Sequence, residues 1–183
     1  TYNVLEASRL NNIKQLIVTS TSEVYGSPRK VPIKESHPLI GQSPYSASKI
    51  AADQLAISYF RSFKLPVKIL RPFNTYGPRQ SQRAIIPTII SQCLNSNIIR
   101  LGNLKPKRDF LYVSDTCQAF LNIARTKNFF GEVFNVGSAQ DISISDLQNK
   151  TIAVDTSIFM YKFMYSHRFI DNFIQQLFHL KSF

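Results

Sequence analysis

The feature that most constrains the fold is an alternation of helix-like and strand-like segments along the chain. Residues 2–10 have the apolar spacing of an amphipathic helix, with Val4, Leu5 and Ala7 expected on its inner side. The next apolar run, Leu16–Thr19, has the length and composition of a strand buried on both faces. A strand that directly follows a helix is typical of a parallel sheet, so the sequence favours the α/β class from its first twenty residues.

The same alternation continues downstream. Ser43 supplies an N-cap hydroxyl and Pro44 a favourable first helical residue, so a helix is expected to start there and to run to about Phe63. Ser114 or Asp115 can cap a later helix. The further expected elements are strands at 67–70 and 133–136 and helices at 84–94 and 114–124. This order predicts an α/β sandwich with a mostly parallel sheet.

Composition narrows the class of protein. The chain has 183 residues, 44% of them hydrophobic, which is enough for one domain with a core. No apolar run approaches the roughly 20 residues that a membrane span needs, so a soluble protein without membrane contact is expected. Cys93 and Cys117 lie in apolar, helical-looking stretches without neighbouring Cys or His pairs, so buried reduced thiols are expected, with no metal site and no disulfide framework. Reduced thiols indicate a cytoplasmic location.

The charge is strongly basic and unevenly distributed. The formal net charge is +11, and residues 54–108 contain ten Lys or Arg and no Asp or Glu. A solvated basic face explains this stretch most simply, and a phosphate-bearing small molecule is the next interpretation. Nucleic acid is the third, but it would require exposed aromatic residues interleaved with the basic ones on one face.

Two short polar segments carry the candidate chemistry. Tyr45 and Lys49 are four residues apart, so they share one face of the expected helix, and an ammonium beside a phenol stabilises the phenolate that a tyrosine base requires. Thr21 and Glu23 follow the carboxyl end of the first strand, where open α/β sheets gather their ligands. Thr21 can bond a substrate hydroxyl, and Glu23 can move a proton if it is buried. The plainer alternatives are an amphipathic surface helix and a capping turn.

These segments belong to four motifs that occur in one order along the chain. The motifs are Thr21–Gly26 (TSEVYG), Tyr45-x-x-x-Lys49, Arg71–Pro78 (RPFNTYGP) and Arg108–Val113 (RDFLYV). Together they resemble the extended short-chain dehydrogenase/reductase family and, within it, the nucleotide-sugar 4,6-dehydratases. The likeness runs from about Thr1 to Leu147. It implies a partial Rossmann-like, doubly wound parallel sheet that lacks its first strands.

The resemblance also implies roles for individual residues. Tyr45 would take the proton from the sugar 4-hydroxyl while a hydride passes from C4 to NAD, with Lys49 as its electrostatic partner and cofactor-ribose contact. Thr21 would bind the 4-hydroxyl. Glu23, with Ser22, would act in the loss of water across C5 and C6, after which the hydride returns to C6. The sequence leaves NADP open as an alternative cofactor.

Four more residues are assigned by the same resemblance. Phe73 would lie beside the nicotinamide, Asn74 and Asn135 would contact the substrate, and Arg108 would bind the nucleotide diphosphate, where a guanidinium fork matches phosphate oxygens. A solvated loop cation is the alternative for Arg108, because Lys105 and Lys107 stand beside it. The implied partner is a nucleotide sugar, with a homodimer expected for the intact enzyme and nucleic acid not expected.

Ser22 bears on the substrate. Several dehydratases of this family have Asp at this position, whereas those that resemble GDP-mannose and UDP-N-acetylglucosamine dehydratases have Ser, so the sequence points away from the dTDP-glucose branch. An epimerase or decarboxylase of the same family is the alternative, although simple epimerases usually lack the carboxylate at Glu23. An alternative of another class is a noncatalytic fragment or a nucleic-acid-binding fusion.

The two ends of the chain carry separate expectations. Its six glycines form no Gly-rich phosphate loop, and the resemblance places that loop upstream of Thr1, so the chain is expected to be a fragment that does not turn over alone. Residues 148–183 are expected to be an unrelated tail. One interpretation is the start of a flap-endonuclease type nuclease with Asp155 as a first metal ligand, and the other is a Phe-rich amphipathic helix.

Overall fold

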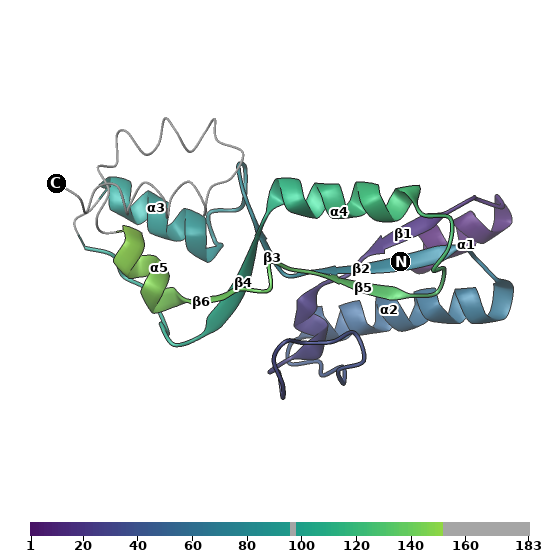
Figure 1. The fold of residues 1–183 in the computed structure, drawn as a ribbon, viewed down its shortest axis with the longest axis horizontal. Helices are drawn as coiled ribbons and strands as arrows, with labels where there is room; N and C mark the ends of the chain where they lie inside the picture. Colours follow the sequence, from purple (N-terminus) through teal and green to yellow (C-terminus); the bar gives the residue numbers. More distant parts are fainter. Residues whose placement is uncertain (96–97, 152–183) are drawn as a thin grey trace. The chain divides into compact units, whose positions relative to one another are not determined.

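The computed structural model describes residues 1–95 and 98–151 (Figure 1). Its elements are α1 (Tyr2–Leu10), β1 (Leu16–Thr19), the short 3₁₀ helix η1 (Ser22–Tyr25), α2 (Pro44–Phe63), β2 (Val67–Pro72), β3 (Asn74–Tyr76), α3 (Ile85–Asn95), β4 (Lys107–Tyr112), α4 (Val113–Arg125), β5 (Val133–Val136), β6 (Asp141–Ser143) and α5 (Ile144–Thr151). The expectations for Asp155 and the Phe-rich segment lie outside the described residues. The expected boundary at Leu147 falls inside α5, and the division into 1–147 and 148–183 stays a prediction.

The chain forms two compact units. The first comprises Thr1–Asn74 and Asp115–Ala139, and the second comprises Thr75–Ser114 and the residues from Gln140 onward. Each unit has its own small sheet and its own apolar core.

The sheet of the first unit is parallel, in the order β1-β2-β5. Val18 pairs with Ile69, and Ile69 pairs with Val133, so β2 is the central strand of the three. Figure 1 shows α2 and α4 on opposite faces of this sheet. Parallel strands joined by crossover helices on both faces are the doubly wound arrangement, which confirms the α/β, Rossmann-like expectation.

Burial differs between the strands of this sheet. β2 is buried along its first five residues, whereas β1 is half-buried and ends in an exposed Thr19. The expectation that both faces of β1 are buried is therefore wrong, because β1 is an edge strand of the described sheet. In α1 the buried residues are Leu5 and Ser8, while Val4 and Ala7 are exposed. The prediction is thus confirmed for Leu5 and wrong for Val4 and Ala7, so the inner face lies about one residue further along the chain.

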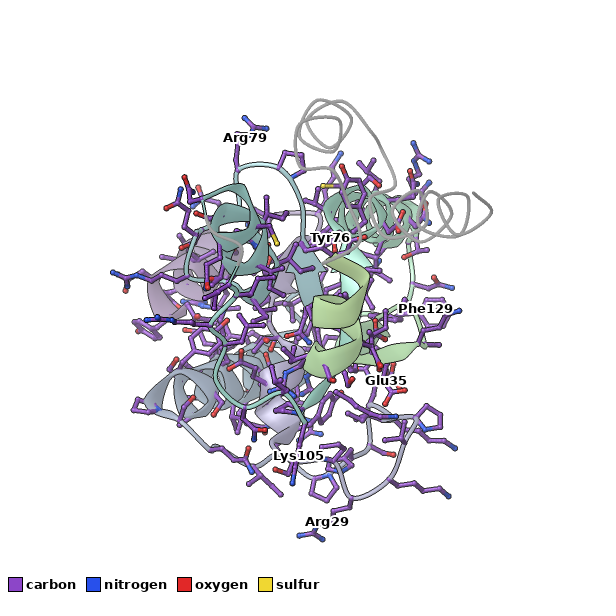
Figure 2. All side chains as sticks on the ribbon, turned by 90° about the vertical axis from the view of Figure 1, so that its left-hand side faces the viewer. Arg29, Glu35, Tyr76, Arg79, Lys105 and Phe129 are labelled. Atoms are coloured by element: carbon purple, nitrogen blue, oxygen red, sulfur yellow. The ribbon has the colours of Figure 1, made fainter. Side chains whose placement is uncertain are left out.

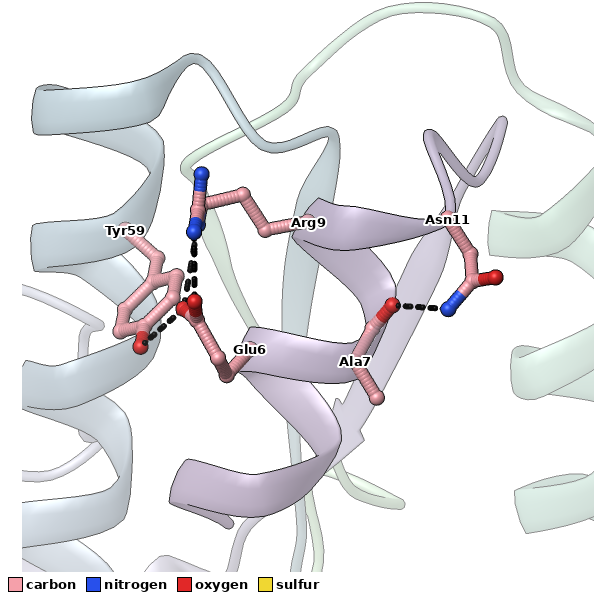
Figure 3. Close-up of polar contacts among 5 residues, drawn as sticks. All are labelled: Glu6, Ala7, Arg9, Asn11 and Tyr59. Atoms are coloured by element: carbon pink, nitrogen blue, oxygen red, sulfur yellow. Dashed lines mark hydrogen bonds and ion pairs between the residues drawn. The ribbon is translucent and has the colours of Figure 1, made fainter.

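A polar contact joins α1 to α2 at the edge of the first core. Tyr59 of α2 is buried, and its hydroxyl donates to Glu6 Oε2 at 2.9 Å, while Arg9 Nε donates to the same carboxylate at 3.0 Å (Figure 3). The hydrogen bonds from Arg9 and Tyr59 lower the pKa of Glu6. Burial, reinforced by the bond to Glu6, raises the pKa of Tyr59 to about 12.

The second unit contains elements that the sequence did not reveal. Its sheet has the order β3-β4-β6, and β4 and β6 are antiparallel, with Arg108 opposite Ile142. Two of these strands are only three residues long, and β4 is exposed at its start and buried at its end, so none shows a period of two. The buried core residues are Tyr76, Ile86, Ile89, Phe110, Tyr112, Ile144 and Leu147.

The two cysteines are free thiols. Cys93 in α3 is half-buried, and burial raises the pKa of its thiol, whereas Cys117 in α4 is exposed. The expectation of a buried thiol is therefore wrong for Cys117. Helix α4 begins at Val113, one residue before the expected caps, which places Ser114 and Asp115 in its first turn. Within the described ranges, no helix has the length and apolarity to cross a membrane.

Candidate functional site

The start of α2 holds Tyr45 and Lys49. The helix begins with a capping box in which Ser43 Oγ accepts from Ser46 N and Ser46 Oγ accepts from Ser43 N, with Pro44 as the first helical residue. Tyr45 is half exposed, and Lys49 Nζ lies 6.0 Å from the centroid of its ring. Lys49 Nζ donates to Thr19 O at 3.0 Å. The lysine therefore fastens this helix to the carboxyl end of β1.

The turn after β1 holds the other three candidate catalytic residues. Thr21 is the N-cap of η1, and its Oγ1 accepts from Glu23 N at 3.2 Å. The capping role considered for this segment is thus present, and the Thr21 hydroxyl still has a proton to donate to an acceptor. Thr21 and Ser22 are half-buried, whereas Glu23 is exposed, so the burial expected for Glu23 is not found.

η1 packs against α2 within the first unit. Since Lys49 reaches Thr19 and Thr21 follows two residues later, both candidate segments lie at the carboxyl end of β1. This is the edge of a parallel sheet at which α/β folds bind their ligands. The catalytic roles of Thr21, Ser22, Glu23, Tyr45 and Lys49 remain predictions.

The carboxyl ends of the neighbouring strands add Phe73, Asn74 and Asn135. Phe73 and Asn74 follow β2 and are half-buried, and Phe73 N donates to Val136 O at 2.9 Å. Asn135 of β5 pairs with Arg71 in the sheet. Phe73 and Asn74 thus lie just beyond the carboxyl end of β2, Asn135 lies in the adjacent β5, and their contacts with cofactor and substrate remain predictions.

The side chain of Asn135 is already engaged within the protein. Its Oδ1 accepts from Tyr25 Oη at 2.6 Å, and its Nδ2 donates to Ile33 O at 3.0 Å. Its backbone N donates to Glu35 Oε1 at 2.9 Å. These bonds tie β5 to η1 and to the loop between η1 and α2, so a substrate contact at Asn135 would have to coexist with them.

A buried ion pair that the sequence reasoning missed lies beneath this edge. Asp53 of α2 is fully buried and Arg71 of β2 nearly so. Arg71 Nε and Nη2 both lie 2.9 Å from Asp53 Oδ2, and Arg71 Nη1 donates to Tyr25 Oη at 2.9 Å. Burial raises the pKa of Tyr25, against the opposing effect of the Arg71 bond. The sequence offered one signal for Asp53. It follows Lys49 by four residues, which places it on the same side of the helix as the candidate site residues.

A second buried cation lies at the opposite end of β2. Lys68 is fully buried, and burial lowers the pKa of its ammonium. Its Nζ donates to Ile123 O at 3.0 Å, to Thr126 O and Thr126 Oγ1 at 2.7 Å, and to Gln15 Oε1 at 3.0 Å. Two of the ten basic residues in the acid-free stretch are therefore interior, and that stretch is not a single charged face.

Arg108 belongs to the second unit and is exposed in β4. Its Nη1 donates to Lys107 O at 2.9 Å, and Lys107 Nζ lies 3.4 Å from Asp141 Oδ2. Arg79 of the same unit also carries an exposed side chain, which points away from the ribbon in Figure 2. Both guanidinium groups are accessible to an anion, and the diphosphate contact of Arg108 stays a prediction.

Comparison with known proteins bears on these residues. The family model described as GDP-mannose 4,6 dehydratase matches residues 1–168. A dTDP-D-glucose 4,6-dehydratase of Dictyostelium discoideum is 39% identical over 166 residues, which cover 84% of this chain and 38% of that protein. The chain thus spans less than half of that relative's length.

Two solved structures show the same fold. A dTDP-glucose 4,6-dehydratase from Bacillus anthracis in complex with NAD superposes with a TM-score of 0.77 at 33% identity, over 81% of this chain and 48% of the other. A UDP-N-acetylglucosamine 4-epimerase from Methanobrevibacter ruminantium, in complex with UDP-N-acetylmuramic acid, gives a TM-score of 0.74 at 34% identity, over 81% and 49%. Dehydratases and epimerases therefore share the architecture described above.

Proposed function

Because the chain belongs to the GDP-mannose 4,6-dehydratase family of extended short-chain dehydrogenases/reductases, we propose that it carries the reaction centre of an NAD-dependent nucleotide-sugar 4,6-dehydratase. The observation that supports this most is the bond from Lys49 Nζ to Thr19 O. It holds the helix that carries Tyr45 at the strand end from which Thr21 and Glu23 emerge. A simple dehydrogenase centre needs the tyrosine and lysine, whereas a dehydratase also needs a group such as Glu23 for the elimination.

The two proton transfers of the reaction, from the sugar 4-hydroxyl and from C5, are assigned to different residues of the chain. Tyr45 takes the proton of the sugar 4-hydroxyl, and Lys49 Nζ lies 6.0 Å from the centroid of its ring. Thr21 orients the same hydroxyl by a hydrogen bond. Once C4 is a ketone, the C5 proton becomes acidic. Glu23 is exposed rather than buried, and its part here is that of the base that removes this proton. The proton then passes by way of the Ser22 hydroxyl to the C6 oxygen, which leaves as water.

The donors present fit the nicotinamide half of a dinucleotide. Lys49 has three N–H donors and uses one on Thr19, so the others can serve ribose hydroxyls beside the Tyr45 phenol. Phe73, half-buried at the end of β2, supplies an aromatic surface for the nicotinamide ring. NAD supplies a reversible hydride acceptor when bound. NADP would supply the same chemistry, and the structure of B. anthracis dTDP-glucose 4,6-dehydratase contains NAD.

Two observations bear on the nucleotide in different directions. Ser22 supports a GDP-mannose or UDP-N-acetylglucosamine substrate, whereas the D. discoideum relative and the B. anthracis structure are dTDP-glucose 4,6-dehydratases. Our proposal therefore specifies the reaction, and an experiment identifies the nucleotide. Binding of the three nucleotide sugars is compared by calorimetry, and the preferred one should saturate a single site. The exposed Arg108 is our candidate for its diphosphate.

An epimerase is the second candidate, since the M. ruminantium structure is an epimerase. Epimerisation at C4 needs no base for C5, so Glu23 distinguishes the two functions. The intact protein is incubated with NAD and each nucleotide sugar, because the chain alone is not expected to turn over, and the products are separated by chromatography and identified by mass. Loss of one water gives a 4-keto-6-deoxy sugar and supports dehydration, whereas a separate product with the mass of the substrate supports epimerisation.

Matched variants connect the activity to the site. Tyr45→Phe should reduce turnover by about 10²–10⁴-fold, the usual contribution of a general base. Glu23→Gln should block the loss of water while hydride transfer to NAD persists. Tyr2→Phe and Glu132→Gln, at exposed positions, serve as controls and should leave turnover unchanged. Equal turnover by Tyr45→Phe and the unsubstituted protein would refute this reaction centre.

The partners follow from the same proposal. The substrate is a nucleotide sugar, and the intact protein is a homodimer, which sedimentation can measure. If the chain instead bound nucleic acid, its affinity for DNA would fall steeply with added salt, because such binding depends on phosphate neutralisation.

A further inference from the structure

We infer that Arg71 and Asp53 act through Tyr25 to position the turn that carries Glu23 against the helix that carries Tyr45. Tyr25, Arg71 and Asp53 are positioning residues in this inference, and none of them needs to touch substrate. The inference deepens the proposed function and, for its catalytic consequence, rests on it.

The turn that carries Glu23 has little stability of its own. η1 is a 3₁₀ helix of four residues, and such short helices form only with tertiary support. Its outward residue Glu23 is exposed, while its last residue, Tyr25, is fully buried. The orientation of Glu23 therefore depends on what holds Tyr25.

Arg71 holds Tyr25 and Asp53 at the same time. Its Nη1 donates to Tyr25 Oη, and its Nε and Nη2 point at Asp53 Oδ2, each at 2.9 Å. The guanidinium is planar and its donors have fixed directions, so the positions of the phenol and the carboxylate are fixed relative to each other. The guanidinium carbon also lies 5.0 Å from the centroid of the Tyr25 ring.

Asp53 transmits this constraint to the catalytic helix. Tyr45, Lys49 and Asp53 are spaced by four residues along α2, which places them on one side of the helix. A continuous set of hydrogen bonds thus runs from the helix of the candidate base to the turn of the candidate carboxylate. Lys49 gives a second attachment of α2, through Thr19.

The hydroxyl of Tyr25 has a determined direction. Arg71 can only donate, so Tyr25 Oη accepts from it and donates its own proton to Asn135 Oδ1 at 2.6 Å. Asn135 in turn holds Ile33 O, while Glu35, labelled in Figure 2, receives the Asn135 backbone N–H. The loop after η1 is therefore tied to the same phenol.

This arrangement suits positioning better than stability. A buried ion pair often contributes little net stability compared with apolar residues of similar size, whereas it fixes the groups it bonds. Misplacing a catalytic group by about 1 Å can reduce a rate by about 10²-fold. Since oxidation at C4 uses Tyr45 and elimination uses Glu23, loosening η1 should slow the elimination more than the oxidation.

The first test measures the position of the turn without any reaction. Tyr25→Phe keeps the ring and removes only the hydroxyl. The amides of Gly26 and Ile40, which donate to Glu23 O and Val24 O, should exchange with solvent at least about 10-fold faster in the variant. Amides of α2 should be unchanged. Tyr59→Phe, which removes another buried hydroxyl of the first unit, is the control and should leave the Gly26 and Ile40 amides unaffected.

The second test measures the catalytic consequence. For Tyr25→Phe, loss of the C5 proton in deuterated water should slow by about 10²-fold, whereas single-turnover reduction of NAD and the KM for the nucleotide sugar should change less than about 3-fold. Asp53→Asn keeps the size of the side chain. It should also slow loss of the C5 proton more than reduction of NAD, but by a smaller factor than Tyr25→Phe. It also covers the case in which Tyr25→Phe fails to fold.

The outcomes separate the two proposals. Unchanged exchange at Gly26 and Ile40 in both variants overturns the inference, whatever the enzyme does. Equal slowing of oxidation and elimination also overturns it, because a general loss of structure has that effect. If the intact protein oxidises no nucleotide sugar, the proposed function fails, and the exchange experiment still decides whether Arg71 and Asp53 hold the turn.

Discussion

The two ends of β2 both bury a cation, but they satisfy it in different ways. At the amino end Lys68 donates to neutral oxygens, including Ile123 O and Thr126 O at the end of α4. At the carboxyl end Arg71 meets the carboxylate of Asp53 and the phenol of Tyr25. The residues are three apart on a strand, so they point to opposite faces of the sheet.

From this difference we infer a structural role for Lys68 and the positioning role described above for Arg71. Carbonyls at a helix C-terminus carry partial negative charge, so Lys68 serves as a cap that joins α4 to the sheet. Arg71 instead fixes two ionisable side chains and, through Tyr25, the turn beside the candidate site. The paired charges thus lie at the strand end where α/β folds bind ligands.

The largest effect is expected from unpairing the ions at the carboxyl end. Arg71→Met leaves the Asp53 carboxylate buried without its cation, which should reduce the free energy of unfolding by about 3–5 kcal/mol. Urea denaturation measures it. Arg61→Met, at an exposed site, is the control. The double variant Arg71→Met/Asp53→Leu should recover much of the loss, and no recovery would show that the pair is not the cause.

Gly131 tests the packing at the amino end. It has φ +84°, its N donates to Val67 O at 2.7 Å, and an added Cβ would collide with the ring of Phe60. Gly131→Ala should therefore cost about 1–3 kcal/mol from overpacking, with backbone strain in addition. Gly102→Ala, where nothing lies within 4 Å of an added Cβ, is the matched control. Equal midpoints in thermal denaturation would contradict the close approach.

Removing the cation at the amino end should cost less than unpairing Arg71. Lys68→Met leaves several acceptors without their donor but no buried charge, so a loss of about 1–3 kcal/mol is expected. Lys127→Met, at an exposed site, should change stability little. If Lys68→Met were as damaging as Arg71→Met, the distinction between a neutral and a charged set of partners would fail.

The hydrogen bond from Tyr59 to the carboxylate of Glu6 should make the stability of the protein depend on pH. Its pKa is raised from 10.0 to about 12 in the folded chain, so the unfolded chain loses this proton first. The associated stability is fully present below pH 10 and is lost as pH rises to about 12. Tyr59→Phe should remove this part of the slope, as measured by urea denaturation at several pH values. Exposed Tyr2→Phe should retain it.

Local pattern was sufficient for the positions of α1 to α4 and of the parallel strands. The expected strand at Leu16–Thr19 and the expected helix from Ser43 and Pro44 to Phe63 agree with β1 and α2, because apolar runs, capping and helical spacing are encoded within a few residues. The short strands of the second unit were missed, since three residues contain no measurable period. The inner face of α1 was also misplaced, because that face is chosen by the helix against which it packs.

The candidate site shows the same division. The sequence by itself determined that Thr21 and Glu23 follow a strand end and that Tyr45 and Lys49 share one face of a helix. The bond from Lys49 to Thr19, which brings the two segments together, was visible only in the tertiary structure. Only the tertiary structure decided that the basic residues in β2 are buried. Lys68 and Arg71 look like surface charges, and they are buried because oxygens from distant segments surround them. An ionised side chain can leave water only where such partners converge, and that convergence is a property of the fold.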